Sequence, residues 1–241
     1  MRLIGDYHMH SKYSGDSKNE IEAIVKQAIS VGLEEIAITD HGPGHSGYGI
    51  KRENYKLLRQ QIDELRGKYP QIRILLGIEA NILGRDGALD MDEEMLNITD
   101  WLNAGYHFGA KISEDYMIHL YNFLSRFSGY FYRKAKAINT QTMVRAMHRN
   151  QIKAITHPGA KGPIDMDAVA KAAAETHTML EINNSHGHLS AEEIQIAMQY
   201  DVQFILGSDA HELVNIGKVP DALDRVQKAR LGLDRIYNIR L

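Results

Sequence analysis

Each of seven predicted strands ends in a residue that can bind a metal ion, and this regularity constrains the fold more than any single motif. The strand ends, in chain order, are His8-Met9-His10, Asp40-His41, Glu79, His107, His157, Asn183-Asn184-Ser185-His186 and Asp209-Ala210-His211. In an open sheet, only the switch point of the strand order would be expected to carry chemistry. Closing parallel strands into a barrel instead brings all their carboxyl ends onto one rim, so the pattern favours a barrel.

Strand and helix patterns alternate almost throughout, which predicts a parallel sheet with right-handed crossovers. Predicted strands cover residues 2–7, 35–39, 72–82, 101–106, 152–156, 178–183 and 202–207. Predicted helices cover residues 20–31, 53–67, 92–98, 165–176, 190–200 and 219–231. We expect residues 1–241 to form a single α/β domain built on a seven-stranded parallel β/α (TIM-like) barrel.

A helical insertion at about residues 113–150 replaces one crossover and is rich in aromatic and basic side chains. We interpret it as a packed outer-helix layer or a subunit interface, because aromatic stripes are usually buried. The alternative is a rim that stacks bases or positions a phosphate.

Composition narrows the classes of protein that the chain can belong to. The sequence has no cysteine, which excludes disulfides and thiolate metal sites. The net charge of −3 gives no support for general binding of nucleic acid or an anionic membrane. We expect no signal peptide, because the first residues lack a long apolar run, and no stretch approaches the roughly 18 apolar residues of a membrane helix. We therefore expect a soluble cytoplasmic protein with no membrane partner.

The first strand presents two imidazoles to one face. His8 and His10 are two residues apart, so on a strand both side chains point the same way and can reach one cation. Asp16 lies eight residues beyond His8 in the first loop, where it can bend back over the same site.

Two further strand ends carry carboxylates, Asp40 and Glu79, at positions where packing of the strand alone would not need them. Asp40 and His41 follow a buried apolar strand, and we expect Asp40 to hydrogen-bond a ligand imidazole and fix its tautomer. Glu79 lies inside an apolar strand, where a carboxylate is costly unless it is charge-paired or metal-bound. Because a carboxylate can bridge two cations, Glu79 is the candidate bridge. We interpret His45, in the loop that follows His41, as loop surface.

The later strand ends complete the set. His107 and His157 occupy equivalent places on successive strands, and Asp209 and His211 repeat the spacing of His8 and His10. His186 and His188 follow a strand end and are candidates to bind substrate oxygens or to donate a proton to a leaving group. Lys111 and Lys161 are candidates to hold a phosphate, with plain surface charge as the alternative. The remaining histidines, which we interpret as structural or surface groups, are His119, His148 and His177.

These residues match the motifs of a known family. The segments that carry the match are DYHMHSKYSGD, ITDHGPG, GIEANILGRDGALD, AGYHF, ITHPGAKG, EINNS and GSDAH, in this order. The chain resembles the PHP (polymerase and histidinol phosphatase) superfamily along nearly its whole length. EINNS and the DHGP loop are most similar to the YcdX-like phosphatase branch, and GIEANIL with DGALD is also similar to the PHP domain of bacterial family-X DNA polymerases.

The resemblance implies a distorted seven-stranded β/α barrel with a trinuclear metal centre at its carboxyl rim. The first implied set of ligands is His8, His10, Glu79 and Asp209. Glu79 would bridge to a second ion held by His107 and His157, and the third ion would be held by Asp16, His41 and His211. Some members have a His where this chain has Asp16, so the third site here is richer in oxygen. The resemblance thus implies up to three divalent ions. The family uses zinc, manganese or iron, and ligation by imidazole and carboxylate groups does not distinguish among these metals.

The hypothesis is a metal-dependent phosphatase, a hydrolase that acts on phosphomonoesters of small molecules. A hydroxide bridging two cations would attack phosphorus in line, and the third cation would stabilise the leaving oxygen. The candidate catalytic residues are Glu79, Asp209 and His211. Three alternatives stay open: a PHP-type exonuclease or phosphodiesterase on nucleic acid, a histidinol-phosphate phosphatase, and a metal-binding module without catalysis. The sequence leaves the oligomeric state undetermined.

Overall fold

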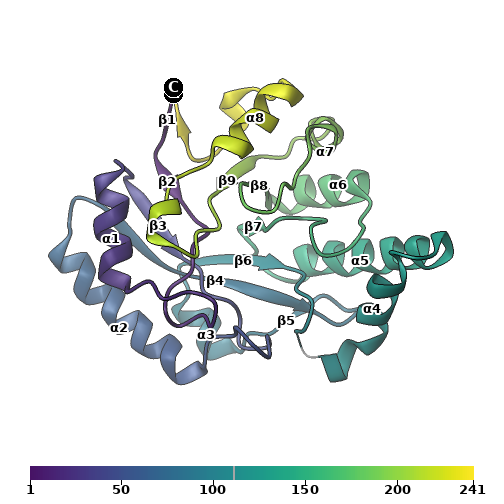
Figure 1. Ribbon diagram of the computed structural model, residues 1–241, viewed down its shortest axis with the longest axis horizontal. Helices are drawn as coiled ribbons and strands as arrows, with labels where there is room; N and C mark the ends of the chain where they lie inside the picture. Colours follow the sequence, from purple (N-terminus) through teal and green to yellow (C-terminus); the bar gives the residue numbers. More distant parts are fainter. Residues whose placement is uncertain (111) are drawn as a thin grey trace.

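Seven parallel strands form a nearly closed barrel in the computed structural model, which describes residues 1–110 and 112–241 and no side chains of 112–115. The strand order is β2 (Gly5–Asp6), β3 (Glu35–Ile38), β4 (Arg73–Leu83), β6 (Trp101–Gly105), β7 (Ala154–Ile155), β8 (Met179–Asn183) and β9 (Phe204–Gly207). The last strand returns to the first through a parallel bridge between Met9 and Ala210. The predicted barrel is therefore confirmed (Figure 1).

Helices connect the strands and cover the outside of the barrel (Figure 1). They are α1 (Ile21–Ser30), α2 (Arg52–Lys68), α3 (Glu93–Ile98), α4 (Ile112–Leu124), α5 (Gly129–Arg149), α6 (Met166–Thr176), α7 (Ala191–Ala197) and α8 (Pro220–Ala229). In α2, the buried residues Tyr55, Leu58, Ile62 and Leu65 recur every three or four positions, which places one apolar face on the sheet. Within the described residues, no helix has the length and apolar character needed to cross a bilayer.

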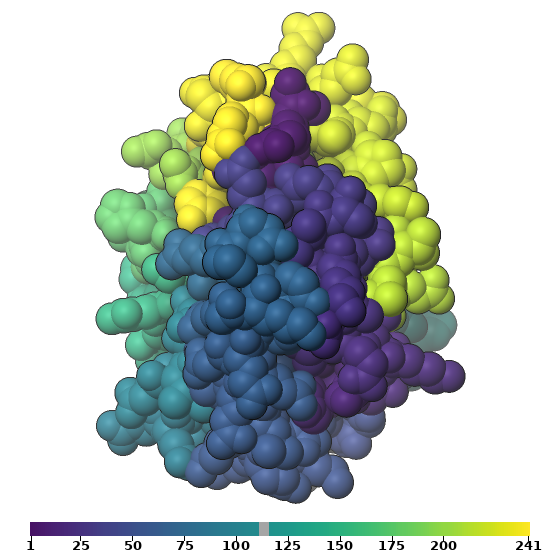
Figure 2. Space-filling view, turned by 90° about the vertical axis from the view of Figure 1, so that its left-hand side faces the viewer, coloured from purple at the N-terminus to yellow at the C-terminus, as the bar shows by residue number. Residues whose placement is uncertain are grey.

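The two ends of the chain meet in a small antiparallel pair that the sequence pattern did not predict. The predicted strand at 2–7 divides into β2 and β1 (Arg2–Leu3), and β1 pairs with β10 (Ile239–Arg240). Figure 2 shows the N-terminal segment lying beside the C-terminal one. A further short strand, β5 (Ala88–Leu89), folds back on β4, and two 3-10 turns are η1 (Leu213–Asn215) and η2 (Leu233–Arg235). Strands of two residues are too short to show an alternating pattern.

The barrel interior changes from apolar to polar along the strands. Alternate residues of a strand share a face, so Met179, Glu181 and Asn183 of β8 all point inward. Met179 belongs to an apolar cluster in which Tyr7 and Trp101 stack with ring centroids 4.2 Å apart. Glu181 and Asn183 come later in the strand, and both are buried among polar partners. The apolar layer closes one end of the barrel, and the polar groups collect toward the carboxyl rim.

Most of the aromatic side chains of α4 and α5 do not form the packed layer that we expected. Phe127, in the turn between the two helices, is 74% exposed, and Tyr116, Phe123, Tyr130 and Tyr132 are also exposed. The buried face of α5 is instead lined by small or amphipathic residues, among them Ala135, Asn139, Thr142, Met143 and Ala146. The prediction of a packed layer was wrong for these aromatics because tertiary packing, rather than residue type, decides which helix face is covered, and the subunit interface stays a prediction.

Candidate metal centre

The carboxyl rim of the barrel surrounds a bowl with about 640 Å³ of empty volume. Seven of the nine predicted ligand residues line it: Asp16, His41, Glu79, His107, His157, Asp209 and His211. The other two, His8 and His10, are 1% and 0% exposed. The remaining lining residues are His45, Tyr48, Phe108, Lys161 and His186. The strand ends predicted to converge therefore do converge.

The ligand atoms lie close enough to share ions. Among the described residues, five groups of potential ligands have nitrogen or oxygen atoms that all lie within 4.8 Å of one another. These groups are His10–Asp16–His41–His211, His8–Glu79–His157, His8–His10–Asp209, His41–Glu79–His107 and His157–His186–Asp209. Together they include all nine residues named as metal ligands, although their binding of metal stays a prediction.

Glu79 occupies the centre of this arrangement. Its Oε1 lies 2.9 Å from His157 Nε2 and 3.2 Å from His107 Nε2. Its Oε2 lies 3.0 Å from His41 Nδ1. Because the two oxygens face different imidazoles, this carboxylate is placed to contact two ions at once.

Several buried atoms in the bowl have no hydrogen-bond partner among the residues that the structure describes. They are the Nε2 atoms of His8, His10 and His107, Nδ1 of His41, Oδ1 of Asp16 and both carboxylate oxygens of Glu79. Buried polar atoms are nearly always paired, so a cluster of unpaired ones needs a ligand. Imidazole nitrogens with carboxylate oxygens suit zinc, manganese or iron, so the residues present fit divalent ions.

Hydrogen bonds behind the imidazoles aim them into the bowl. His8 Nδ1 lies 2.6 Å from Glu181 Oε1, and His107 Nδ1 lies 2.9 Å from Asn81 Oδ1. Both partners are acceptors, so each Nδ1 carries a proton and donates it. Each ring therefore turns its Nε2 toward the site, as ligand histidines commonly do.

Asp40, which we expected to orient a ligand histidine, has Ser11 as its hydrogen-bond partner instead. Its two oxygens accept hydrogen bonds from the backbone N–H and the hydroxyl of Ser11, both at 2.6 Å. The expectation was wrong because Asp40 fixes the loop after His10 rather than a ring. Asp90, which the sequence did not single out, has a similar role: it accepts from the backbone of Gly44 and Asn81.

Glu181 was missed, although a carboxylate inside an apolar strand was the signal that identified Glu79. It is 2% exposed, and it accepts hydrogen bonds from His8 Nδ1 and, at 2.7 Å, from the backbone N–H of His157. A Cβ added at Gly207 would lie 1.8 Å from Glu181 Oε1, so glycine leaves the space that this carboxylate occupies. Glu181 thus holds two predicted ligands without lining the bowl.

We expect Glu181→Gln to weaken metal binding about 10- to 100-fold, because His8 loses its anionic partner. Competition with a coloured chelator measures the affinity. Glu192→Gln, an exposed carboxylate on α7, is the matched control and should bind metal like the wild type. Equal affinities for the two variants would show that Glu181 does not support the centre.

Burial and neighbouring charges divide the imidazoles of the bowl into two kinds. Burial lowers the pKa of His10 to about 3 and the pKa values of His107 and His186 to about 4, so these rings are neutral. For His41, burial is outweighed by the nearby carboxylates of Asp16 and Glu79, which raise its pKa to about 10.

The two buried carboxylates of the bowl, Glu79 and Asp209, have lowered pKa values. Burial acts to raise the pKa of Glu79, but the imidazoles of His107 and His8 that face it hold it well below its ordinary value. The pKa of Asp209 is also held well below its ordinary value, against burial, by the charge of His8 and the nearby ring of His10. Without metal, the bowl therefore places ionised carboxylates beside the protonated ring of His41 and the neutral rings of His10, His107 and His186.

The predicted substrate-binding residues are placed unequally. Lys161 lines the bowl with its Nζ 3.4 Å from His186 Nε2, and His186 Nε2 lies 3.3 Å from Asp209 Oδ2. His188 does not line it, and its Nδ1 lies 3.4 Å from Glu193 Oε2. Lys111 lies outside the described residues.

His45, which we interpreted as loop surface, lines the bowl and stacks on Tyr48 with ring centroids 4.7 Å apart. Its Nδ1 accepts hydrogen bonds from the backbone N–H groups of Gly47 and Tyr48, at 3.3 and 3.1 Å. Burial lowers its pKa, so the ring is neutral with its proton on Nε2. The ring is thus fixed in the wall of the bowl, with its N–H directed to the backbone of Phe108.

The sequence and the fold both have known counterparts. A family model described as "PHP domain" matches residues 6–195. A protein of Escherichia fergusonii named "Probable phosphatase YcdX" is 31% identical over 248 residues, which cover 97% of this chain and 89% of that protein. A "Probable phosphatase" of Syntrophotalea carbinolica is 31% identical over 242 residues, covering 97% and 90%.

A solved structure also has a similar fold. The histidinol phosphate phosphatase of Lactococcus lactis, in complex with zinc, L-histidinol and phosphate, superposes with a TM-score of 0.66. The match covers 95% of this chain and 94% of that one, at 19% sequence identity. At this identity, the likeness supports the barrel architecture.

Proposed function

The chain belongs to the PHP domain family, and on that basis we propose that it is a metal-dependent phosphatase that hydrolyses phosphomonoesters of small molecules. The observation that carries the proposal is the set of buried, unpaired nitrogen and oxygen atoms that converge on one bowl. Divalent ions bound there would activate water at neutral pH and offset the charge of a phosphoryl group.

The charge of the bowl suits an anionic substrate once ions are bound. Three carboxylates line it, Asp16, Glu79 and Asp209, and up to three divalent ions would outweigh them. The surplus positive charge would attract a phosphate, although the chain as a whole is mildly acidic. The relatives named as phosphatases are consistent with this substrate class.

The residues of the chain would divide the work by position. Glu79 would hold two ions at a constant separation with its two oxygens. Asp209 and His211 would complete the ligand sets, and His211 is oriented by its Nδ1, which donates to the Asp209 carbonyl at 3.0 Å. Lys161 would bind a phosphate oxygen through its ammonium group, while His186 would donate a hydrogen bond to an oxygen of the substrate.

The identity and number of the ions belong to the proposal. Zinc, manganese and iron all accept the available imidazole and carboxylate ligands. Zinc is present in the solved histidinol phosphate phosphatase, and the same ion is a reasonable first choice here. Histidinol phosphate is one small phosphomonoester to include among the substrates tested.

Cleavage of nucleic acid is the second candidate, and the exposed aromatics of α4 and α5 are its support. Phe127, Tyr130 and Tyr132 are open to solvent, as a base-stacking surface requires. However, none of the three lines the bowl, where Tyr48 and Phe108 are the aromatic residues. The placement therefore favours a small substrate.

Substrate comparison separates the two candidates. We expect the protein with added Zn²⁺ or Mn²⁺ to release phosphate from p-nitrophenyl phosphate and from a mononucleotide, and to leave a single-stranded oligonucleotide intact. Full activity of His10→Ala, or shortening of the oligonucleotide without release of phosphate from monoesters, would contradict the proposal.

We expect Lys161→Met to raise KM for p-nitrophenyl phosphate about 10-fold with little change in kcat, because a charge-assisted hydrogen bond is worth about 1.5–3 kcal/mol and is made to the ground state and the transition state alike. Steady-state kinetics measures both constants. Lys171→Met, on the exposed side of α6, is the matched control. An unchanged KM would show that the ammonium group does not bind the phosphate.

A further inference from the structure

A buried carboxylate outside the bowl connects two segments that carry predicted ligands. Asp90 follows β5, and the pairing of β5 with β4 brings it beside Asn81. It is 6% exposed and does not line the bowl. On one side it bonds the loop after His41, and on the other it bonds Asn81, whose side chain contacts His107. Asp90 thus links the two imidazoles that face Glu79 from either side.

The loop after His41 has room for this carboxylate because two of its residues are glycine. A Cβ added at Gly44 would lie 2.9 Å from the Asp90 Cβ, and one added at Gly42 would overlap both carboxylate oxygens. Glycine at both positions lets the backbone approach the acid closely. The Gly44 N–H then donates a hydrogen bond to Asp90 Oδ2 at 2.7 Å.

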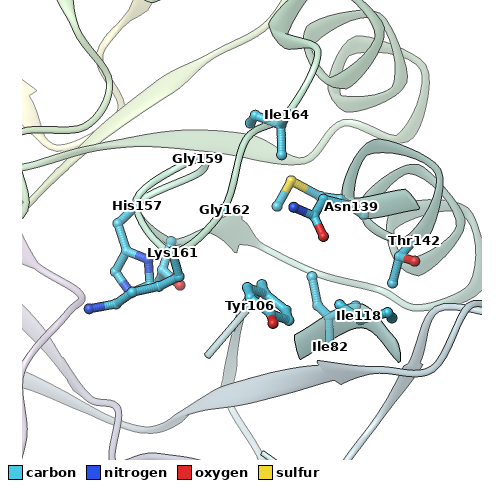
Figure 3. Close-up of a pocket in the computed structure, with 12 residues that line it drawn as sticks. Ile82, Tyr106, Ile118, Asn139, Thr142, His157, Gly159, Lys161, Gly162 and Ile164 are labelled. Carbon is cyan, nitrogen blue, oxygen red and sulfur yellow. The ribbon is translucent and has the colours of Figure 1, made fainter. Parts of the chain in front are cut away.

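Asn81 points from β4 toward the interior of the barrel. It shares a face of the strand with Glu79, two residues earlier, because strand side chains alternate. The next residue, Ile82, points the other way and lies beside Tyr106 and Ile118 (Figure 3). Asn81 is 0% exposed, so its amide must find its hydrogen-bond partners within the protein.

Those partners fix the orientation of the Asn81 amide. Both oxygens of Asp90 face backbone N–H groups, Oδ1 that of Asn81 at 2.8 Å and Oδ2 that of Gly44. A backbone N–H can only donate, so the Asp90 carboxylate acts as an acceptor. The Gly42 carbonyl, 3.3 Å from Asn81 Nδ2, is also only an acceptor. Asn81 must therefore turn its NH₂ group to Asp90 and Gly42, which leaves its oxygen for His107.

The orientation of this amide decides which nitrogen of His107 carries the proton. Asn81 Oδ1 accepts a hydrogen bond from His107 Nδ1 at 2.9 Å. With the proton held on Nδ1, Nε2 is free to bind an ion, and it faces Glu79 Oε1 at 3.2 Å. An amide turned the other way would offer an N–H to Nδ1. The proton of the neutral ring would then move to Nε2, the atom that a metal ion needs.

We propose that Asp90 is a positioning residue that prepares His107 for metal through Asn81 and fixes the loop after His41. The inference rests on the proposed metal centre. Glu181 bonds His8 directly, whereas Asp90 acts through an amide whose orientation it sets. A change that lets this amide turn should therefore weaken metal binding without removing any ligand.

The position of the proton is measured in the metal-free protein. In NMR spectra of protein with nitrogen-labelled histidine at pH 8, with His107→Ala to assign the signals, we expect the wild-type ring to carry its proton on Nδ1. Asp90→Asn keeps the shape but has only one acceptor oxygen, so the Asn81 amide can turn and part of the His107 population should carry the proton on Nε2. A wild-type proton on Nε2 would overturn the proposal, whichever variants fold.

Metal affinity provides the second measurement. We expect Asp90→Asn to bind zinc at least about 10-fold more weakly than the wild type in competition with a coloured chelator. A folded Asp90→Asn protein with the wild-type proton position and zinc affinity would overturn the proposal.

Asp100→Asn is the matched control for a purely structural role. Asp100 also accepts from a backbone N–H, that of Leu76 at 2.8 Å, and it pairs with Arg59 and Arg66. Its partners in the described part of the chain include no predicted ligand. We expect this variant to lose stability but to bind zinc like the wild type. Equal weakening of zinc binding in both variants would overturn the proposal.

Exchanging the two side chains keeps the test decisive if Asp90→Asn alone does not fold. The double variant Asn81→Asp with Asp90→Asn places a carboxylate, which can only accept, beside His107. We expect its proton on Nδ1 and its zinc affinity within about threefold of the wild type. Zinc binding at least about 10-fold weaker than that of the wild type would overturn the proposal.

Failure of the proposed function is a separate outcome, because neither measurement uses turnover. Zinc binding that responds to Asp90→Asn as expected, without hydrolysis of any phosphomonoester, would overturn the phosphatase and support the role of Asp90. Hydrolysis together with unchanged zinc affinity in folded Asp90→Asn would overturn the role of Asp90 and leave the phosphatase intact.

Discussion

Replacing Glu79 by Gln is expected to lower kcat/KM for phosphomonoesters about 10³-fold. The same change is expected to remove about one bound ion per chain. The carboxylate is fully buried and faces His157 and His107 with one oxygen and His41 with the other. An amide offers one oxygen and no charge, so it cannot serve both groups of ligands. Activity assays and elemental analysis of the purified protein measure the two effects.

The matched control is Glu175→Gln, an exposed carboxylate on α6 that lies 3.5 Å from His148 Nε2. It should keep both activity and metal. Circular dichroism of Glu79→Gln establishes whether the barrel has folded. A folded Glu79→Gln protein with wild-type activity would rule out the bowl as the catalytic centre.

Removing metal should lower the melting temperature by about 8–16 °C at pH 8. An ion present at about 1,000 times its Kd stabilises the folded state by about 4 kcal/mol. For a chain of this size, each kcal/mol is worth about 2–4 °C. Differential scanning calorimetry with and without a chelator measures the change, and Glu79→Gln should show a smaller one.

The stabilisation by metal should be larger at pH 8.5 than at pH 6. In the metal-free protein, the pKa of His41 is raised to about 10, so the stability that it contributes is complete below about pH 6.5 and is lost as the pH rises toward 10. The lowered pKa values of Glu79 and Asp209 contribute stability that is present above about pH 4.5 and is lost in acid. Metal must also displace the proton of His41, which is easier at high pH.

The contrast between the two pH values provides the check. Calorimetry of metal-free protein should give a higher melting temperature at pH 6 than at pH 8.5, and the metal-dependent gain should follow the opposite order. A gain that is constant across this range would contradict the assignment of His41 as a protonated group that metal displaces.

The sequence predicted the barrel and the nine candidate ligands because both depend on local patterns. The alternation of strands and helices leads to a parallel barrel, and the barrel places every strand end on one rim. His8 and His10 share a face because a strand repeats every two residues, whatever surrounds it. Even Glu181 carried a readable signal, since its carboxylate interrupts an apolar strand as Glu79 does.

Other features depended on contacts between distant parts of the chain. Asp40 pairs with Ser11 and not with an imidazole, and His45 faces the bowl because its loop folds over the rim. The pairing of β1 with β10 joins the two ends of the chain, which no local pattern specifies. The aromatics of α4 and α5 are exposed because the helices turn other residues toward the barrel.

By itself, the sequence determined the fold class, the rim on which the site lies and the chemical types of the ligands, because residue periodicity is a property of the backbone. Only the tertiary structure decided which nitrogen of each ring faces inward, and which carboxylates support the bowl rather than line it. Those features arise where side chains from separate strands and helices pack together, and packing is set by the whole chain at once.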